Sequence, residues 1–207
     1  MRRVITAEDV PPAGDLRIPV DSIVTSTARE LADARGVRIL EVPDDQLSGA
    51  AAPNLTIALG SDHGGFPMKE QIKPLLEGLG LEIRDVGVYE EKPADYPDIA
   101  CKVADLVVSG VATRGIIVDG AGIGSCMAAN KVPGIRAALC YDKASARNSR
   151  EHNDSNVLTL GGRLLTGTQA EEVVRTWIAT AFGGGRHQAR VDKIMAIEQR
   201  CQKKGTL

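Results

Sequence analysis

The chain has 207 residues, which is enough for one α/β domain of ordinary size and a shorter additional segment. Its 25 basic and 27 acidic residues give a net charge of −2, which argues against a nucleic-acid-binding protein, because such proteins usually concentrate a basic excess on one face. Aromatic residues make up only 3% of the chain, so the core must be aliphatic and aromatic platforms for base stacking are not expected.

The apolar runs and the cysteines indicate in which cellular compartment the protein is expected. No apolar run approaches the roughly 20 residues of a membrane-spanning helix, and the basic N-terminus lacks the apolar stretch of a signal peptide. The four cysteines, Cys101, Cys126, Cys140 and Cys201, contain no C-x-x-C pair, so neither a metal site nor a disulfide framework is predicted. We therefore expect a cytoplasmic protein with reduced thiols and no membrane partner.

Residues 1–54 differ in character from the rest and are interpreted as an extension with a linker. The capping-box pattern at residues 27–30 predicts a short helix that Gly36 ends, and Arg38–Val42 is a candidate strand. The Pro-, Ala- and Ser-containing stretch over 43–53 is typical of a linker. Because about 40 residues are marginal for an independent core, we expect the segment to dock on the main domain or to bind another protein.

From residue 55 onward, short apolar runs alternate with helical patterns. The runs are continuous, as in strands buried on both faces, and lie at 55–60, 81–86, 115–118, 135–140 and 157–160. Helices are predicted over 67–79, 97–108, 125–131, 143–150 and 168–182. The alternation predicts an α/β domain over 55–207 with a five-stranded, parallel, doubly wound sheet of flavodoxin-like or Rossmann-like type.

A last helix is predicted over 188–203, after the glycines at 183–185. Its apolar positions form a modest stripe bordered by charged residues: Val191, Ile194, Met195 and Ile197. Such a helix either packs on its own domain or embraces a second subunit. We favour the second reading and expect a C-terminal dimerisation helix.

Polar residues follow the predicted strands, and in open α/β sheets ligands bind at the carboxyl ends of strands. Asp62 and His63 follow the first strand, and Asp119 with its glycine-rich turn follows the third. His152 and Asn153 come one helix after the fourth strand, and Arg186, His187 and Arg190 lie near the C-terminus. Each group taken alone is also explained as a helix cap, a tight turn or a solvated charge cluster.

Together, these groups indicate a small phosphorylated substrate. Arginine matches phosphate geometry, a glycine turn at a helix start offers N–H groups to an anion, and histidine moves protons near neutral pH. The chain has no G-x-x-x-x-G-K-[ST] motif, and Gly120, Gly122 and Gly124 miss the spacing of a dinucleotide-binding fingerprint.

Several ordered motifs carry a family resemblance. Residues 57–66, 95–97, 128–137, 152–158 and 184–187 resemble the ribose-5-phosphate isomerase B family, which also includes galactose-6-phosphate isomerase subunits. The resemblance runs from about residue 55 to 200 and leaves 1–54 outside. It implies a flavodoxin-like subunit, a homodimer or a pair of dimers, and active sites made by both chains. It also implies cofactor-free interconversion of an aldose phosphate and a ketose phosphate.

The resemblance also implies roles for individual residues. His152 would assist opening of the sugar ring, and Asp62 would act on the sugar hydroxyls and their protons. The sugar and the phosphate would be held by His63, Tyr96, Asn153, Arg186, His187 and Arg190. The amides of Gly120, Gly122 and Gly124 would stabilise the enediolate intermediate.

The chain departs from the family pattern at the position of the base. Many members end the third strand in a cysteine that serves as the base, whereas this chain has Asp119. Another subgroup uses a glutamate just after the loop's last glycine, where this chain has Ser125. We expect Asp119 to be the base, because a carboxylate can transfer a proton between neighbouring carbons. Ala121 stands where the family has threonine, which removes one donor to the developing oxyanion.

Ribose 5-phosphate is the expected substrate, and two alternatives stay open. One is the same chemistry on allose 6-phosphate, galactose 6-phosphate or a tetrulose phosphate. The other is a non-catalytic protein that kept the phosphate site. The extension is compatible with recruitment to a larger assembly, such as a bacterial microcompartment, and equally with simple docking.

Overall fold

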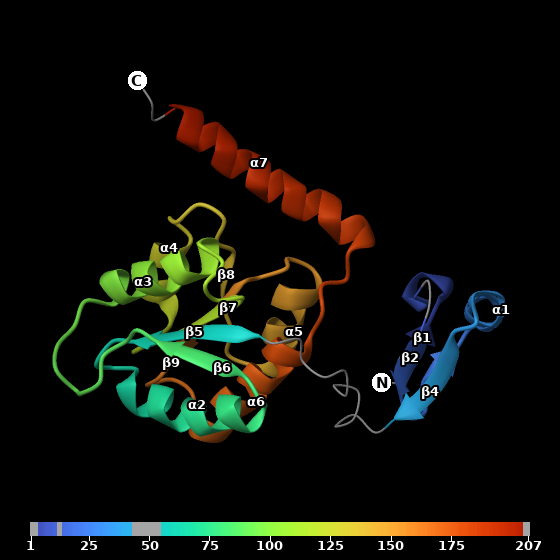
Figure 1. Ribbon diagram of the computed structural model, residues 1–207, viewed down its shortest axis with the longest axis horizontal. Coiled ribbons are helices and arrows are strands. Elements are labelled where there is room, and N and C mark those ends of the chain that lie inside the picture. The colour runs from blue at the N-terminus through green and yellow to red at the C-terminus, as the bar shows by residue number, and fades with distance from the viewer. Residues whose placement is uncertain (1–3, 12–13, 43–54, 205–207) are drawn as a thin grey trace. The chain divides into compact units, whose positions relative to one another are not determined.

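The computed structural model describes residues 4–11, 14–42 and 55–204, and the chain divides into two compact units, Met1–Ala51 and Ala52–Leu207 (Figure 1). The linker predicted over 43–53 lies outside the described residues. Among the helices of the described ranges, none is long and apolar enough to cross a membrane.

The described part of the N-terminal unit combines a helix with two small parallel sheets. Strand β1 (Val4–Ile5) pairs with β3 (Ile23–Val24), and β2 (Asp15–Pro19) pairs with β4 (Arg38–Val42). The other elements are the 3-10 turn η1 (Ala7–Asp9) and α1 (Ser26–Arg35). The strand predicted at Arg38–Val42 is confirmed. The unit has an apolar core of its own, although its length alone made one marginal: Ile5, Val10, Ile18, Ala28, Ala32 and Val37.

Helix α1 begins earlier than the capping-box pattern predicted. The hydroxyl of Thr25 accepts a hydrogen bond from the backbone N–H of Ala28 at 3.3 Å, so Thr25 is the N-cap and Thr27 already lies inside the helix. The predicted end is confirmed, because Gly36 follows the helix in the left-handed conformation with a φ of 65°.

The second unit alternates strands and helices along the chain. Its strands are β5 (Thr56–Ser61), β6 (Glu82–Asp85), β7 (Arg114–Asp119), β8 (Ala137–Leu139) and β9 (Val157–Gly161). Its helices are α2 (Phe66–Gly78), α3 (Tyr96–Val108), α4 (Ile123–Ala129), α5 (Lys143–Glu151), α6 (Gly167–Ala179), the 3-10 turn η2 (Gly185–His187) and α7 (Gln188–Lys204). All pairs of neighbouring strands are parallel, which confirms the predicted α/β fold with a five-stranded sheet.

The strand order, which the sequence left open, is β6-β5-β7-β9-β8. In flavodoxin the strands follow the order 2-1-3-4-5, so here the last two strands exchange places. The edge strand β8 is shorter than the run predicted over 135–140. Just before the strand, the backbone N–H of Arg136 bonds the side chain of Asn156 at 2.7 Å.

Helices cover both faces of the sheet, as Figure 1 shows for α2 and α6 on one side and α3 and α4 on the other. Successive side chains of a strand point to opposite faces. In β5, Ile57 and Leu59 therefore join the apolar layer under α2 and α6, whereas Ala58 joins the layer under α3 and α4. Trp177 of α6 is fully buried, and its indole N–H donates to the Ser155 hydroxyl at 2.8 Å.

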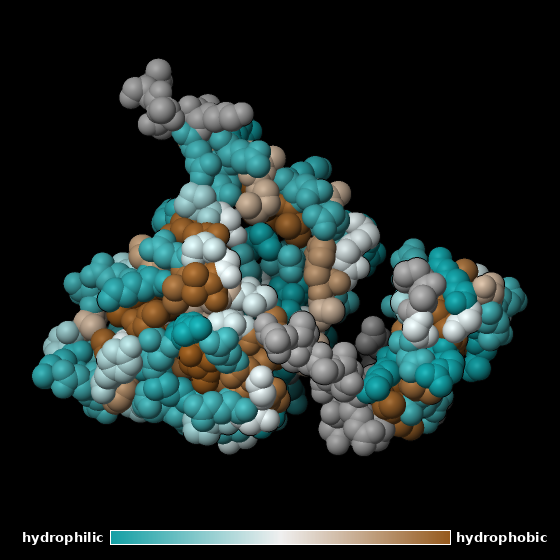
Figure 2. Space-filling view, in the orientation of Figure 1, coloured by the Kyte–Doolittle hydropathy of each residue, from teal (hydrophilic) through white to brown (hydrophobic). Residues whose placement is uncertain are grey.

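The helix predicted over 188–203 is present as α7, which follows the glycines at 183–185 (Figure 1). Glu198 accepts a hydrogen bond from the backbone N–H of Gly134 at 3.0 Å, and Val191 is buried. Ile194 and Ile197 stay about half exposed. The visible side of the helix is mainly hydrophilic (Figure 2).

Candidate active site

Three loops meet at the carboxyl ends of the central strands β5, β7 and β9. The backbone N–H of Asp62 donates to the Val118 carbonyl at 3.2 Å, and that of Gly162 donates to the Asp119 carbonyl at 2.7 Å. Gly65 is required here, because a Cβ at this position would lie 2.0 Å from the Val118 carbonyl oxygen. The loops therefore lie against each other through backbone, with no side chain between them. We call this region the carboxyl-edge site; it comprises Asp62, His63, Tyr96, Asp119 and the loop 120–125.

The carboxylate of Asp119 organises the turn that follows β7. Its side chain is buried, with 4% of the residue exposed. Oδ1 accepts hydrogen bonds from the backbone N–H groups of Ala121, at 2.8 Å, and Gly122, while Oδ2 accepts one from Ser125 at 2.9 Å. Three N–H donors stabilise the charged carboxylate and tie the end of β7 to the first turn of α4.

This arrangement changes what the glycine turn offers to a substrate. The N–H of Gly122 is engaged with Asp119, contrary to the expectation that it faces an enediolate. Gly122 has a φ of +78°, and a Cβ there would lie 2.5 Å from Leu139, so its role is conformational. Gly124 leaves room for a ring, because a Cβ would lie 2.5 Å from Tyr96. The N–H groups of Gly120 and Gly124 are the remaining members of the predicted amide set.

Asp62, His63 and Tyr96 are brought to the same place. Asp62 is 7% exposed, and its Oδ1 accepts the N–H of Gly65 at 2.9 Å, which closes the turn before α2. His63 is half-buried, and its Nδ1 accepts the N–H of Ala94 at 3.3 Å. Tyr96 begins α3, with its ring against Gly124. A carboxylate, an imidazole and a phenol thus surround the Asp119 turn.

Three residues at this edge lay outside the predicted site set. Arg163, two residues after β9, is exposed; its side chain passes 3.7 Å from the Cβ position of Gly120, and its N–H donates to the Gly120 carbonyl. Tyr141 donates its hydroxyl to the Ala121 carbonyl at 2.8 Å. The Ser125 hydroxyl is fully buried and has no hydrogen-bond partner among the described residues. A position just after a predicted strand was the signal that could have found Arg163 and Tyr141.

His152 and Asn153 lie at the opposite edge of the sheet, which corrects their grouping with the carboxyl ends of strands. Helix α5 starts after the carboxyl end of β8 and runs back, so its end at Glu151 returns to the edge where β9 begins. A five-residue strand such as β9 spans about 16 Å. Within one chain, His152 and Asp119 are therefore on different sides of the sheet.

A buried arginine shapes the turn that carries His152. Arg150 is 5% exposed, and its guanidinium donates to Asp154 Oδ1 at 2.8 Å and to the Ser155 carbonyl at 2.6 Å. Asp154 also bonds Arg136 at 3.0 Å and adopts a positive φ of 46°. These bonds fix residues 150–155 between α5 and β9.

His187 stacks on His152 and joins two arginines to it. The ring centroids are 4.2 Å apart and the rings are inclined by 9°. Burial lowers the pKa of His187 below its ordinary 6.5, and electrostatic repulsion from His152, Arg186 and Arg190 acts in the same direction. Arg186 and Arg190 are exposed. We call His152, Asn153, Arg186, His187 and Arg190 the amino-edge cluster.

An open pocket of about 410 Å³ adjoins this cluster on α5 and is lined by Lys143, Ala144, Arg147, Asn148, Glu151 and His152. Asn148 holds the His152 ring through a hydrogen bond of 2.9 Å to Nδ1. Arg186 and Arg190 of the cluster, together with Lys143 of the pocket, are suited to bind an anionic ligand. The structure thus gathers the predicted residues in two groups, one at each edge of the sheet.

Known proteins share this domain. The model of the ribose/galactose isomerase family matches residues 57–194. The ribose-5-phosphate isomerase B of Escherichia coli is 44% identical over 144 residues, which cover 70% of this chain and 97% of that protein. The chain belongs to the ribose/galactose isomerase family. It is accordingly an enzyme of the aldose–ketose isomerase class, an intramolecular oxidoreductase.

Solved structures of family members agree with the fold. A ribose-5-phosphate isomerase B from Clostridium thermocellum is 48% identical, with a TM-score of 0.70. The match covers 70% of this chain and 99% of the Clostridium chain. The enzyme from Mycoplasma genitalium with bound ribulose-5-phosphate is 39% identical, with a TM-score of 0.67, over 70% of this chain and 96% of that one. The family match begins at residue 57, so the N-terminal unit lies outside it.

The depressed pKa of His187 makes a prediction about stability. Well above pH 6.5 the imidazole is neutral in both states, but as the pH falls through 6.5 the unfolded chain binds a proton that the folded chain resists. The free energy of unfolding should therefore fall as pH drops from 6.5 toward the lowered pKa. Urea unfolding at about pH 7.5 and about pH 5.5 should show a smaller pH difference in His187→Gln than in the wild type. An equal difference in both proteins would contradict this assignment.

Proposed function

We propose that this family member converts ribose 5-phosphate to ribulose 5-phosphate without a cofactor, in the cytoplasm. The observation that carries the proposal is the carboxyl-edge site, where two buried carboxylates, Asp62 and Asp119, lie beside His63 and Tyr96. The names of the Escherichia coli and Clostridium thermocellum relatives support this substrate. The bound ribulose-5-phosphate in the Mycoplasma genitalium enzyme supports the product.

We propose further that the enzyme is a homodimer in which each active site combines two subunits. The carboxyl-edge site of one subunit would face the amino-edge cluster of the other, since one chain carries them on opposite edges of its sheet. The carboxylates would then move protons, while Arg186 and Arg190 would hold the phosphate. The exposed Ile194 and Ile197 of α7 support a dimerisation role for that helix.

The chemical steps follow from these groups. His152 removes the proton of the anomeric hydroxyl, and the C1 carbonyl forms as the bond from C1 to the ring oxygen breaks. The imidazolium then returns its proton to that oxygen, which becomes a hydroxyl of the open sugar. A base then removes the C2 proton; the C–H electrons form the C1–C2 double bond, and the carbonyl oxygen becomes the enediolate oxyanion. The base returns its proton to C1, while Asp62 moves the proton between the two sugar oxygens. No net oxidation occurs, because C1 is reduced as C2 is oxidised.

Asp119 is the proposed base, acting through Oδ2. Oδ1 already accepts two backbone N–H groups, whereas Oδ2 accepts one, from Ser125. A carboxylate oxygen has two lone pairs, so Oδ2 keeps one for a substrate proton. The same side chain would thus shape the loop and transfer the proton. The alternatives are the same chemistry on allose 6-phosphate, galactose 6-phosphate or a tetrulose phosphate, and a protein that binds sugar phosphate without turnover.

Asp119 variants test this proposal with ribose 5-phosphate, by following ketose formation. Asp119→Asn should lower kcat by at least about 10³-fold, because an amide cannot accept the C2 proton. It should also lower the melting temperature, because the amide NH₂ replaces one acceptor oxygen and leaves a backbone N–H of the turn unpaired, so kcat is measured at a temperature where the variant is folded. Asp119→Cys restores the thiol of many family members and should retain turnover that iodoacetamide abolishes. Iodoacetamide should leave the wild type active, since its exposed thiols, Cys101 and Cys201, belong to neither part of the proposed site, and the half-buried thiol of Cys126 is engaged with the Ala137 carbonyl at 3.5 Å.

Two results separate the possible failures. Turnover retained by Asp119→Asn would remove Asp119 as the base while leaving the isomerase reading intact. If the wild type is inactive on ribose 5-phosphate, the other aldose phosphates are assayed next. Absence of turnover with all of them would favour the hypothesis of a non-catalytic protein.

The N-terminal unit is proposed to serve recruitment, either to another protein or to a larger assembly such as a microcompartment. It has its own core, and the relatives are matched almost over their full length without it. A chain that begins at residue 52 should therefore keep kcat and dimerisation within about twofold of the full-length values, by the same assay and by sedimentation. A large loss of either would show that the unit supports the isomerase domain directly.

A further inference from the structure

Lys69 is a charged side chain with no exposed surface, at the end of the first turn of α2. Its ammonium donates to Asp85 Oδ1 and Oδ2 at 2.9 and 2.8 Å and to the Val88 carbonyl at 2.8 Å. The Glu70 carboxylate lies 3.2 Å away. A buried ammonium is costly unless every N–H finds an acceptor, and here each does.

The surroundings of Lys69 hold the charge in place. The ammonium lies 5.5 Å from the centre of the Phe66 ring and 5.0 Å from that of Tyr89, within the range of cation–π attraction. Burial by itself raises the pKa of Asp85, but hydrogen bonds from Lys69 and Lys73 outweigh it, so the pKa stays below its ordinary value. Asp85 is therefore an ionised partner at neutral pH.

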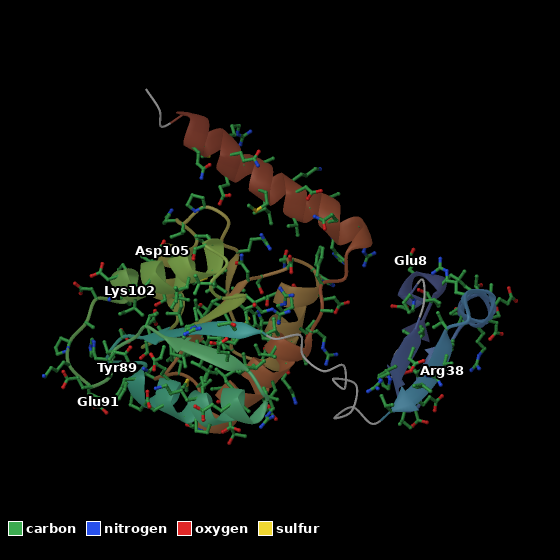
Figure 3. The ribbon with its side chains drawn as sticks, viewed as in Figure 1. Glu8, Arg38, Tyr89, Glu91, Lys102 and Asp105 are labelled. Carbon is green, nitrogen blue, oxygen red and sulfur yellow. The ribbon has the colours of Figure 1, made fainter. Side chains whose placement is uncertain are left out.

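The acceptors of Lys69 flank the start of the loop 86–95, which joins β6 to α3: Asp85 is the last residue of β6, and Val88 is the third residue of the loop. Figure 3 shows Tyr89 and Glu91 in this loop. Asp85 also accepts the N–H of Gly87 at 3.1 Å, and its carbonyl accepts the Tyr89 hydroxyl at 2.9 Å. The N–H of Val88 donates to the Ser61 carbonyl at 3.1 Å, so the loop starts directly beside the end of β5.

The other end of the loop reaches the carboxyl-edge site. The Ala94 N–H donates to Nδ1 of His63 at 3.3 Å, and Tyr96, two residues later, packs on Gly124. The bond to Nδ1 sets the orientation of the imidazole and leaves Nε2 to carry the proton in the neutral ring. Between these anchors, residues 89–93 are exposed, so the loop depends on its two ends for order.

We propose that Lys69 is a positioning residue for substrate binding, because it anchors the loop 86–95 and through it orients His63 and Tyr96. The effect on substrate binding rests on the proposed function, whereas the contacts of Lys69 with the loop are observed whatever the substrate is. Lys69 touches neither His63 nor the Asp119 turn in the described contacts, so its effect on substrate is indirect.

Lys73 is the matched control. It pairs with the same two carboxylates, at 2.6 Å from Asp85 and 3.0 Å from Glu70, but bonds no residue of the loop and is partly exposed. Replacing either lysine removes one charge from the network. Only replacement of Lys69 removes the bond to the Val88 carbonyl.

The experiment compares Lys69→Met and Lys73→Met in the full chain by hydrogen exchange and by kinetics with ribose 5-phosphate. In Lys69→Met, the amides of Gly87, Val88 and Ala94 should exchange faster, while those of β7 and β9 keep their protection. The KM should rise by about tenfold with a smaller change in kcat. Lys73→Met should leave both the loop exchange and the KM near wild type.

Any one of four results would overturn the proposal. They are unchanged loop exchange in Lys69→Met, unchanged KM in that variant, faster exchange spread evenly over the domain, and an equal effect in Lys73→Met. If Lys69→Met does not fold, Tyr89→Phe removes one anchor of the same loop at an exposed site and should shift exchange and KM in the same direction. If the wild type shows no turnover, the proposed function fails separately, and calorimetric binding of ribose 5-phosphate replaces the KM in the same comparison.

Discussion

The carboxylate of Asp119 is the constraint on which the carboxyl-edge site depends. It ends the central strand β7 and accepts three backbone N–H groups from the turn and from α4. A buried carboxylate is stable only with such donors, and the turn needs an acceptor for N–H groups that a helix start leaves unpaired. The carboxylate and the N–H groups of the turn therefore satisfy each other. Having Asp119 in place of the family's usual cysteine thus changes how the turn is held as well as which group can act as the base. The loop is held in place by the residue that is also proposed to transfer the proton.

The parallel sheet explains why the predicted residues fall into two groups. In a parallel sheet, the loops after strands and the loops before strands lie on opposite edges. Asp62 and Asp119 follow strands, whereas His152 and His187 lie where a helix has returned to the start of β9. Among the predicted residues, the first group holds the two carboxylates and no arginine, whereas the second holds Arg186 and Arg190. A second subunit that brings its amino-edge cluster to the carboxyl-edge site would complete the set.

Much of the fold could be predicted from the sequence, because continuous apolar runs mark strands buried on both faces and all five were found. The strand order could not be predicted, since it depends on how the three-residue strand β8 pairs. The sequence indicated which residue types could take part in the chemistry. It could not predict that the Gly122 N–H donates to Asp119, because that bond depends on backbone geometry. The burial of Lys69 was not predicted, because a lysine on a helix is normally exposed. Its burial arises from contacts with a loop that is distant in sequence. The opposite placement of His152 follows from helix direction once the strands are known to be parallel.

The composite site is tested most directly by mixing two inactive variants, Asp119→Asn and His152→Gln, and allowing the subunits to exchange. Random exchange makes half of the dimers hybrid, and each hybrid has one site with an intact carboxyl-edge half and an intact amino-edge half. The account predicts recovery of about a quarter of wild-type turnover of ribose 5-phosphate. No recovery after verified subunit exchange would contradict a site shared between two chains.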